Sequence, residues 1–225
     1  MSKKISFAIL MIIVLVVSSV GAFYFLRSPQ ETIASTVTAG VKAGDVFTYQ
    51  LTGFVESYTD FSIPENFVDI NQTKYYRVEI TKVDVPIVSY TVSWQFNNGT
   101  NFSYDGMINL ENGLCSGHYW DIYAADLLEG SLSRPNSSEE PIISETQLKP
   151  YPNGDREINF LRSEYELYNP ADLTYTEMCY VYNYVYFDKQ TGMMVEYKSM
   201  EIYNSPEIML TVEYKLVSSN IIQVS

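Results

Sequence analysis

The chain has 225 residues, of which 14 are Lys or Arg, 27 are Asp or Glu and one is His, so its formal net charge at pH 7 is −13. A surface of this sign repels nucleic acids and anionic lipid head groups, which excludes proteins that bind nucleic acids through a basic patch. The acidic charge is typical of a solvated exterior, and charge alone does not distinguish that role from an acidic binding surface.

The first predicted element is an apolar segment at the N-terminus. Lys3 and Lys4 precede 22 uncharged residues, 5–26, and only Arg27 follows them closely. As a helix this segment would rise roughly 33 Å, enough to cross a bilayer core of about 30 Å. Because the positive-inside rule keeps the lysines in the cytoplasm, we expect residues 1–27 to form a single-pass transmembrane signal-anchor in the cell membrane. The remainder would then be extracytoplasmic, or extracellular.

A cleaved signal peptide is the alternative for the same residues. Val20 and Ala22 have the small-residue spacing that a signal peptidase accepts. The apolar run nevertheless continues from Phe23 to Leu26, where a polar region is expected before a cleavage site. This continuation favours a retained anchor.

The rest of the chain is predicted to be a linker followed by one domain. Residues 28–44 mix Ser, Thr, Ala and Gly without periodicity and are typical of a stalk. Residues 45–219 are enough for one extracytoplasmic domain with its own core, and 220–225 form a short tail.

Strands dominate the predicted domain. Apolar and polar residues alternate with a period of two in 47–52, 76–81, 88–96 and 208–216. Such alternation predicts antiparallel strands with one buried face. In the turn at 188–192, Asp188 is placed to accept a bond from the backbone and Gly192 to take a left-handed conformation.

One segment departs from this pattern. Apolar residues recur with helical spacing over 120–128 and Gly130 follows, which predicts a helix of about three turns lying over the sheet. Residues 131–155 are rich in Ser, Pro, Asn and Glu and are predicted to be a long exposed loop, whereas 158–168 fit either a helix or a strand. The predicted fold is therefore mainly β: a curved antiparallel sheet, half-barrel or sandwich-like, with a short covering helix, preceded by the N-terminal transmembrane helix.

The strand predicted around 180–187 is bulky on both faces. One face carries Tyr180, Tyr182, Tyr184 and Tyr186. The other face carries Cys179, Val181, Val185 and Phe187. The tyrosines have two interpretations: packing in the core, which is the commoner role, or a ligand surface that offers flat rings and hydroxyl groups.

Two cysteines and four sequons bear on the compartment. Cys115 and Cys179 predict one disulfide on an oxidising side of the membrane, the alternative being two separate buried thiols. Glycosylation of the extracytoplasmic glycoprotein is predicted at the sequon asparagines, which are Asn71, Asn98, Asn101 and Asn136.

No catalytic residue, metal ligand or cofactor is predicted. The segment 113–117, Gly-Leu-Cys-Ser-Gly, has the spacing of a nucleophile elbow, but its thiol needs a histidine positioned by an acid. The single histidine, His118, lies only three residues after Cys115. A closed zinc site needs four ligands, more than Cys115, His118 and Asp121 provide.

Two segments carry a family resemblance. Val41-Lys-Ala-Gly-Asp45-Val-Phe-Thr-Tyr49 and Tyr186-Phe-Asp-Lys-Gln-Thr-Gly-Met-Met-Val-Glu-Tyr197, with the basic N-terminus and apolar anchor, resemble uncharacterised archaeal membrane-anchored surface proteins. The late hairpins also resemble the half-barrel of lipoprotein-carrier proteins, in which a curved sheet holds an apolar ligand under a helix. The resemblance implies this architecture and assigns no functional residue.

The sequence thus predicts a non-enzymatic, membrane-anchored extracytoplasmic protein that binds an apolar ligand, a glycan or an envelope protein through an aromatic face, and binds no nucleic acid. A cavity lined by Tyr182, Tyr184 and Tyr186 would favour this function. A filled core would favour a purely structural cell-envelope module. A carboxylate-based hydrolase is a further alternative, because 27 acidic residues allow many pairs.

Overall fold

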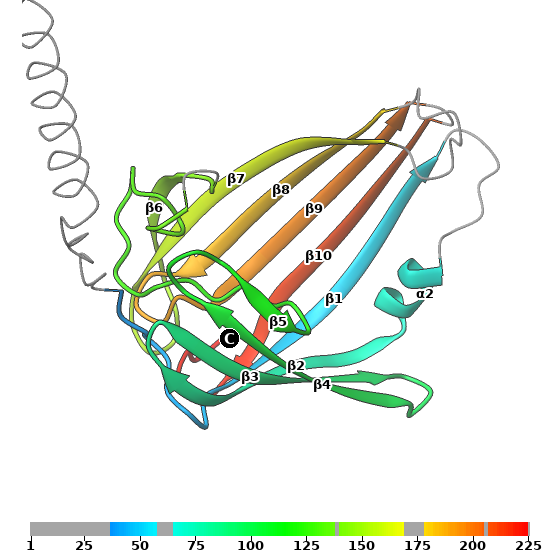
Figure 1. The fold of residues 1–225 in the computed structure, drawn as a ribbon. Helices are drawn as coiled ribbons and strands as arrows, with labels where there is room; N and C mark the ends of the chain where they lie inside the picture. Colours follow the sequence, from blue (N-terminus) through cyan, green and yellow to red (C-terminus); the bar gives the residue numbers. More distant parts are fainter. Residues whose placement is uncertain (1–36, 58–64, 138–139, 169–177, 205–206, 225) are drawn as a thin grey trace, which may run out of the picture. The chain divides into compact units, whose positions relative to one another are not determined.

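The computed structural model describes residues 37–57, 65–137, 140–168, 178–204 and 207–224, which belong to one compact unit (Figure 1). The predicted anchor and most of the predicted stalk lie outside the described residues. Within the described ranges, no helix is both long and apolar enough to cross a membrane. Val37 and Val41, at the start of the described chain, are buried in the core, as is Ile222 near its end.

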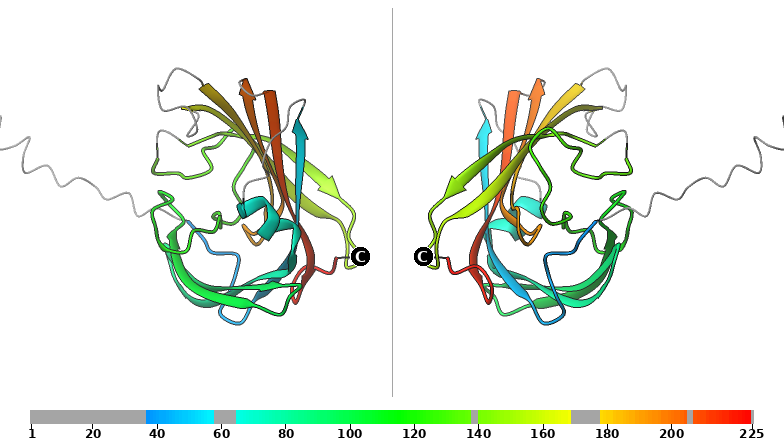
Figure 2. Two further views of the ribbon diagram at one scale, coloured as in Figure 1. Left: turned by 90° about the vertical axis from the view of Figure 1, so that its right-hand side faces the viewer. Right: turned by 90° about the vertical axis from the view of Figure 1, so that its left-hand side faces the viewer.

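All ten described strands belong to a single sheet, in the order β5-β4-β3-β2-β1-β10-β9-β8-β7-β6, and each neighbouring pair is antiparallel. The strands are β1 (Val46–Ser57), β2 (Thr73–Asp84), β3 (Ile87–Phe96), β4 (Asn101–Asn109), β5 (Cys115–Gly117), β6 (Ile143–Lys149), β7 (Arg156–Tyr168), β8 (Met178–Asp188), β9 (Met194–Asn204) and β10 (Glu207–Ser219). The sheet is strongly curved (Figure 2). The prediction of a mainly β, curved antiparallel sheet is confirmed. Because the described strands form one sheet, they do not form a sandwich of two sheets.

The sheet divides into two arms at β1. Strand β1 pairs with β10 from Phe47 to Ser57 but with β2 only from Val46 to Tyr49. Beyond Tyr49 the strand β2 therefore leaves β1, and β2–β4 diverge from the long strands β1 and β7–β10 (Figure 1). The helix α2 (Glu65–Asn71) lies at this divergence, where the amide of Asn71 bonds to both the N–H (2.8 Å) and the carbonyl (3.0 Å) of Gly53.

The core lies on the concave side of the sheet. Alternate residues of the strands point inward and are fully or almost fully buried, including Phe47, Tyr49, Val78, Ile80, Val88, Tyr90 and Val92. This arrangement confirms the period-two prediction for these strands. The segment 158–168, which fitted either a helix or a strand, is part of β7.

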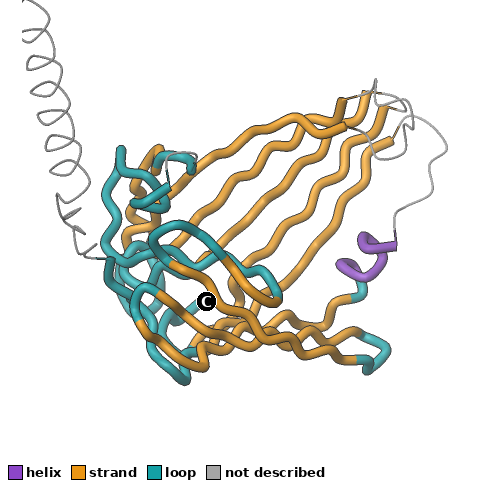
Figure 3. Tube along the Cα trace, viewed as in Figure 1, coloured by secondary structure: helices purple, strands orange, loops and turns teal. Residues whose placement is uncertain are grey.

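The predicted helix over 120–128 is wrong. This segment is an irregular loop, and Figure 3 shows it among the loop segments beside the sheet. The N–H groups of Tyr123, Ala125 and Asp126 bond to the carbonyls of Gly192, Thr38 and Lys189 rather than to carbonyls one turn earlier. Trp120, Tyr123 and Ala124 are buried because the loop itself covers the concave face, whereas Leu128 is 64% exposed, so the helical spacing arose without a helix.

The hairpin between β8 and β9 follows its prediction. Asp188 accepts bonds from the N–H and hydroxyl of Thr191, both at 2.8 Å, and Gly192 has φ +71°. A Cβ on Gly192 would lie 2.0 Å from the carbonyl oxygen of Tyr123. The turn thus requires glycine both for its conformation and for this close approach.

The predicted disulfide is wrong: Cys115 and Cys179 are both free thiols. Cys115 is exposed on β5, at one edge of the sheet, and Cys179 is buried on β8. Six strands separate β5 from β8 in the sheet order. Burial raises the pKa of the Cys179 thiol.

Candidate binding site

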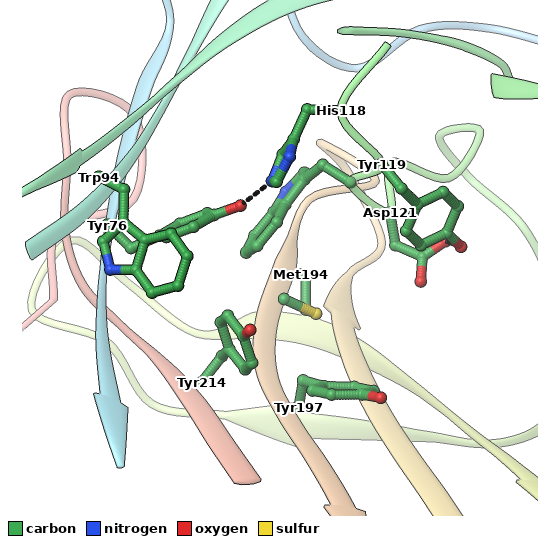
Figure 4. A pocket seen from close by; sticks show the side chains of 9 residues that line it. Tyr76, Trp94, His118, Tyr119, Asp121, Met194, Tyr197 and Tyr214 are labelled. Atoms are coloured by element: carbon green, nitrogen blue, oxygen red, sulfur yellow. Dashed lines mark hydrogen bonds between the residues drawn. The ribbon is translucent and has the colours of Figure 1, made fainter. Parts of the chain in front are cut away.

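The concave face holds a cavity of about 290 Å³ between the two arms of the sheet, here called the concave cavity (Figure 4). Six of its nine lining residues are Tyr or Trp. The lining residues are Tyr76, Trp94, His118, Tyr119, Trp120, Asp121, Met194, Tyr197 and Tyr214.

Strand register positions four of these rings. Tyr76 on β2 is paired with Trp94 on β3, and their ring centroids are 5.7 Å apart. Tyr197 on β9 is paired with Tyr214 on β10, with centroids 5.6 Å apart. The ring of Tyr76 also meets that of Tyr214 edge to face at 5.9 Å, so the two aromatic pairs join across the concave side.

Trp120 belongs to residues 120–128, here called the covering loop, and joins the aromatic cluster from that loop. Its indole stacks on Tyr76 at 5.1 Å and meets Tyr214 edge to face at 5.8 Å. The residue is 5% exposed, and its Nε1 is buried without a hydrogen-bond partner. Leaving a buried donor unpaired costs about 1–3 kcal/mol.

His118 closes one side of the cavity. Its Nε2 lies 2.6 Å from the Tyr76 hydroxyl, and its ring stacks on Tyr104 at 4.9 Å. Burial lowers the pKa of His118 below its usual 6.5 and raises that of Tyr76. Both groups are therefore neutral at pH 7, and one hydrogen bond joins the Tyr76 hydroxyl to Nε2.

The lowered pKa of His118 predicts a pH dependence of stability. Since the unfolded chain binds a proton near pH 6.5 and the folded chain binds it less readily, the contribution of neutral His118 is complete above about pH 6.5 and is lost as the pH falls below it. Urea unfolding at about pH 7.5 and pH 5.5 should show a smaller loss of stability in His118→Phe than in the natural protein. Equal losses in the two proteins would contradict this assignment.

A buried ion pair forms the opposite wall. The Oδ1 of Asp121 accepts bonds from the Tyr119 hydroxyl (2.5 Å) and from Nη2 of Arg134 (3.0 Å). Arg134 is 1% exposed; it also donates to the carbonyl of Ile122, and its guanidinium lies 4.4 Å from the ring centre of Tyr123. These contacts hold Asp121 in place at the edge of the cavity.

A second cavity of about 270 Å³ shares Tyr119, Asp121 and Tyr197 with the first. Its remaining lining residues are Tyr123, Glu140, Pro141, Leu161, Ser163, Tyr165, Asn183 and Val185. No Lys or Arg lines either cavity. The described residues contain no group of His, Cys, Asp and Glu side chains able to hold a metal ion.

The four tyrosines of β8 lie elsewhere. Their inward neighbours on the strand, Cys179, Val181, Val185 and Phe187, are buried, whereas Tyr180 is 36% exposed and Tyr182, Tyr184 and Tyr186 are half-buried. The structure thus brings them together on the outer face, and none of them lines the two cavities. Their role in binding stays a prediction.

Side chains of neighbouring strands lie over these outer rings. Phe160 stacks on Tyr186 with ring centroids 4.7 Å apart. The guanidinium of Arg162 lies 5.4 Å from the Tyr182 ring centre, and the Lys149 ammonium lies 4.5 Å from that of Tyr186. The tyrosines are covered by these long side chains, which explains their partial burial.

Three of the four sequon asparagines have side-chain amides in hydrogen bonds. Asn71 bonds to the backbone of Gly53 through both side-chain atoms, and Nδ2 of Asn136 donates to Glu111 at 2.9 Å. The Oδ1 of Asn98 accepts a bond from the N–H of Thr100 at 2.9 Å. Asn98 and Asn101 are exposed around the turn between β3 and β4. Glycosylation at the four sites remains a prediction.

The concave cavity could not be identified from the sequence. The one available signal was the alternation that places Tyr76, Trp94 and Tyr214 at inward-facing positions. The strand order that brings these rings together depends on pairing between residues far apart in the chain, so no single segment of the sequence predicts it.

No protein-family model matches the chain, and no curated protein matches it. Among solved structures, the chain is similar to a crystal structure described as a "putative lipoprotein" from Parabacteroides distasonis, with 10% sequence identity and a TM-score of 0.47. The match covers 83% of this chain and 100% of that one. The likeness is distant, and these comparisons give no support to the resemblance to archaeal surface proteins.

Proposed function

We propose that this protein is a non-enzymatic binding protein whose concave cavity holds a small, largely apolar molecule. We further propose that it acts outside the cytoplasm, held at the membrane by residues 5–26. The observation that carries the binding proposal is an open cavity of about 290 Å³ in which six of the nine lining residues are Tyr or Trp.

The size and chemistry of the cavity support binding. Ligand pockets are concave, mostly apolar and contain a few polar groups that orient the ligand, and those for drug-sized molecules begin at about 300 Å³. Side chains around an open space lack contacts that a ligand would supply, because protein interiors are otherwise closely packed. The concave cavity therefore suits a small molecule better than a long polymer.

The lining residues favour binding over catalysis. The histidine is hydrogen-bonded to a phenol, and the concave cavity has no Ser or Cys in its lining to act as a nucleophile. Asp121 and Glu140 both line the second cavity, as a carboxylate hydrolase would require. Asp121, however, is bound by Arg134 and Tyr119, and Glu140 accepts a bond from the Ser133 hydroxyl at 3.3 Å. These contacts are suited to fixing the carboxylates in place.

Native mass spectrometry of the full chain, purified in detergent, tests the proposal. The natural protein should carry a bound small molecule, and Tyr214→Ala should lose it because that substitution removes a central ring. Tyr182→Ala is the matched control, since it removes a half-buried tyrosine on the outer face, and it should keep the molecule. Circular dichroism checks that each variant is folded, with Tyr197→Ala as the second cavity variant.

Absence of any bound molecule from the natural protein, together with no binding of added apolar compounds, would contradict the proposed function. Loss of the molecule from Tyr182→Ala, with retention in Tyr214→Ala, would instead assign binding to the outer face.

A further inference from the structure

We infer that the ligand of the concave cavity is an organic cation, an alkylated ammonium; this inference rests on the proposed function. The walls provide the first argument. The face of an aromatic ring carries negative charge and attracts a cation, most strongly for Trp and Tyr, and pockets built from several such rings recognise quaternary ammonium groups. Six of the nine residues around the concave cavity are of these two types.

The charges around the cavity provide the second argument. Asp121 lines both cavities and Glu140 lines the second, while neither cavity has a Lys or Arg in its lining. Asp121 is the one acidic residue in the lining of the concave cavity, and Arg134, which binds its Oδ1, is not part of that lining. Burial lowers the pKa of His118, so the histidine adds no positive charge at pH 7. The charged group that meets the cavity is thus a carboxylate, which favours a cation over an anion.

The alternatives fit less well. An anionic head group would enter a space bordered by Asp121 with no lining cation to pair with it. A hydrated ammonium without alkyl groups would lose its water without gaining apolar contacts from the rings. An alkylated ammonium has both the charge and the apolar surface that the walls match.

The net charge of −13 also raises the concentration of cations near the protein.

The two tryptophans of the chain, Trp94 and Trp120, both line the concave cavity, so the intrinsic fluorescence of the full chain reports on it. Three probes of nearly the same shape separate the possibilities: choline, the neutral 3,3-dimethyl-1-butanol and the anionic 3,3-dimethylbutanoate. We expect choline to bind roughly tenfold more tightly than the neutral alcohol, and the carboxylate to bind most weakly. The affinity for choline should fall in Tyr214→Ala.

The variant Asp121→Asn tests the contribution of charge. It should weaken the binding of choline and leave that of the neutral alcohol unchanged, whereas Glu164→Gln, on an exposed acid that lines neither cavity, should change neither. If Asp121→Asn does not fold, the relative affinities of the natural protein for the three probes still test the cation inference. Equal or tighter binding of the neutral alcohol would overturn the cation inference while leaving the proposed function intact. No fluorescence change with any probe would also overturn it, and native mass spectrometry then judges the proposed function separately.

Discussion

Asp188→Ala should lower the free energy of unfolding by about 3–5 kcal/mol. The side chain of Asp188 is fully buried, and its two oxygens accept bonds from Nε and Nη2 of Arg156 at 2.6 and 2.8 Å. One of these oxygens also accepts the two bonds from Thr191 that shape the turn between β8 and β9. The substitution leaves the largely buried guanidinium of Arg156 without its counter-charge, and small domains have only about 5–15 kcal/mol of total stability. Urea unfolding measures the change.

Glu164→Ala is the matched control for this prediction. Glu164 also forms an ion pair with an arginine, Arg162, at 2.8 Å, but both side chains are about half or more exposed to solvent. Exposed pairs contribute about 1 kcal/mol or less, so this variant should unfold close to the natural protein. A similar loss in Asp188→Ala and Glu164→Ala would show that burial of the Asp188 pair does not control stability.

Arg134→Ala is the second substitution with a large expected effect, a loss of about 3–5 kcal/mol. The guanidinium is the buried counter-charge of Asp121, whose side chain is 19% exposed, and it is a donor to the Ile122 carbonyl. Removing it leaves the carboxylate and the carbonyl without that donor and opens a space beside Tyr123. Because these groups position the covering loop, the thermal midpoint should fall by several degrees or more.

The control for Arg134 is Arg162→Ala, which removes an arginine whose side chain is 48% exposed. It should cost about 1 kcal/mol or less. Arg134→Met, which restores apolar volume but no charge, should recover only the packing contribution. If Arg134→Met were as stable as the natural protein, the ion pair with Asp121 would not be the source of the stability.

The strands could be predicted from the sequence because their signal is local. Alternation in 88–96 places Val88, Tyr90 and Val92 on one face, and all three are buried in the structure. The hairpin at 188–192 was predictable for the same reason, since its hydrogen bonds join residues within the turn. Each of these features depends on residues that are close in the chain.

The covering loop could not be predicted in this way. Residues 120–128 have helical spacing, but Tyr123 and Asp126 bond to the carbonyls of Gly192 and Lys189, more than sixty residues later. Arg134 lies in a segment whose composition predicts an exposed loop, and its burial depends on the Asp121 carboxylate and the Ile122 carbonyl. Partners of this kind are visible only in the folded chain.

The candidate site depends on the same long-range information. Inward positions for Tyr76, Trp94 and Tyr214 follow from alternation, but their convergence depends on the departure of β2 from β1 after Tyr49. The tyrosines of β8 are a second example. Bulky residues on both faces of the strand suggested that both faces are packed in the core, but the outer rings are covered only by side chains of Phe160, Arg162 and Lys149. Local patterns therefore assign faces but do not reveal what covers them.

A crystal structure of the purified full chain tests the central claim most directly, namely that the concave cavity is a binding site. We predict electron density for a small molecule between Tyr76, Trp120 and Tyr214. It should lie in contact with these three rings. A cavity closed by side chains, or an empty cavity with a ligand on the outer face of β8, would contradict the account.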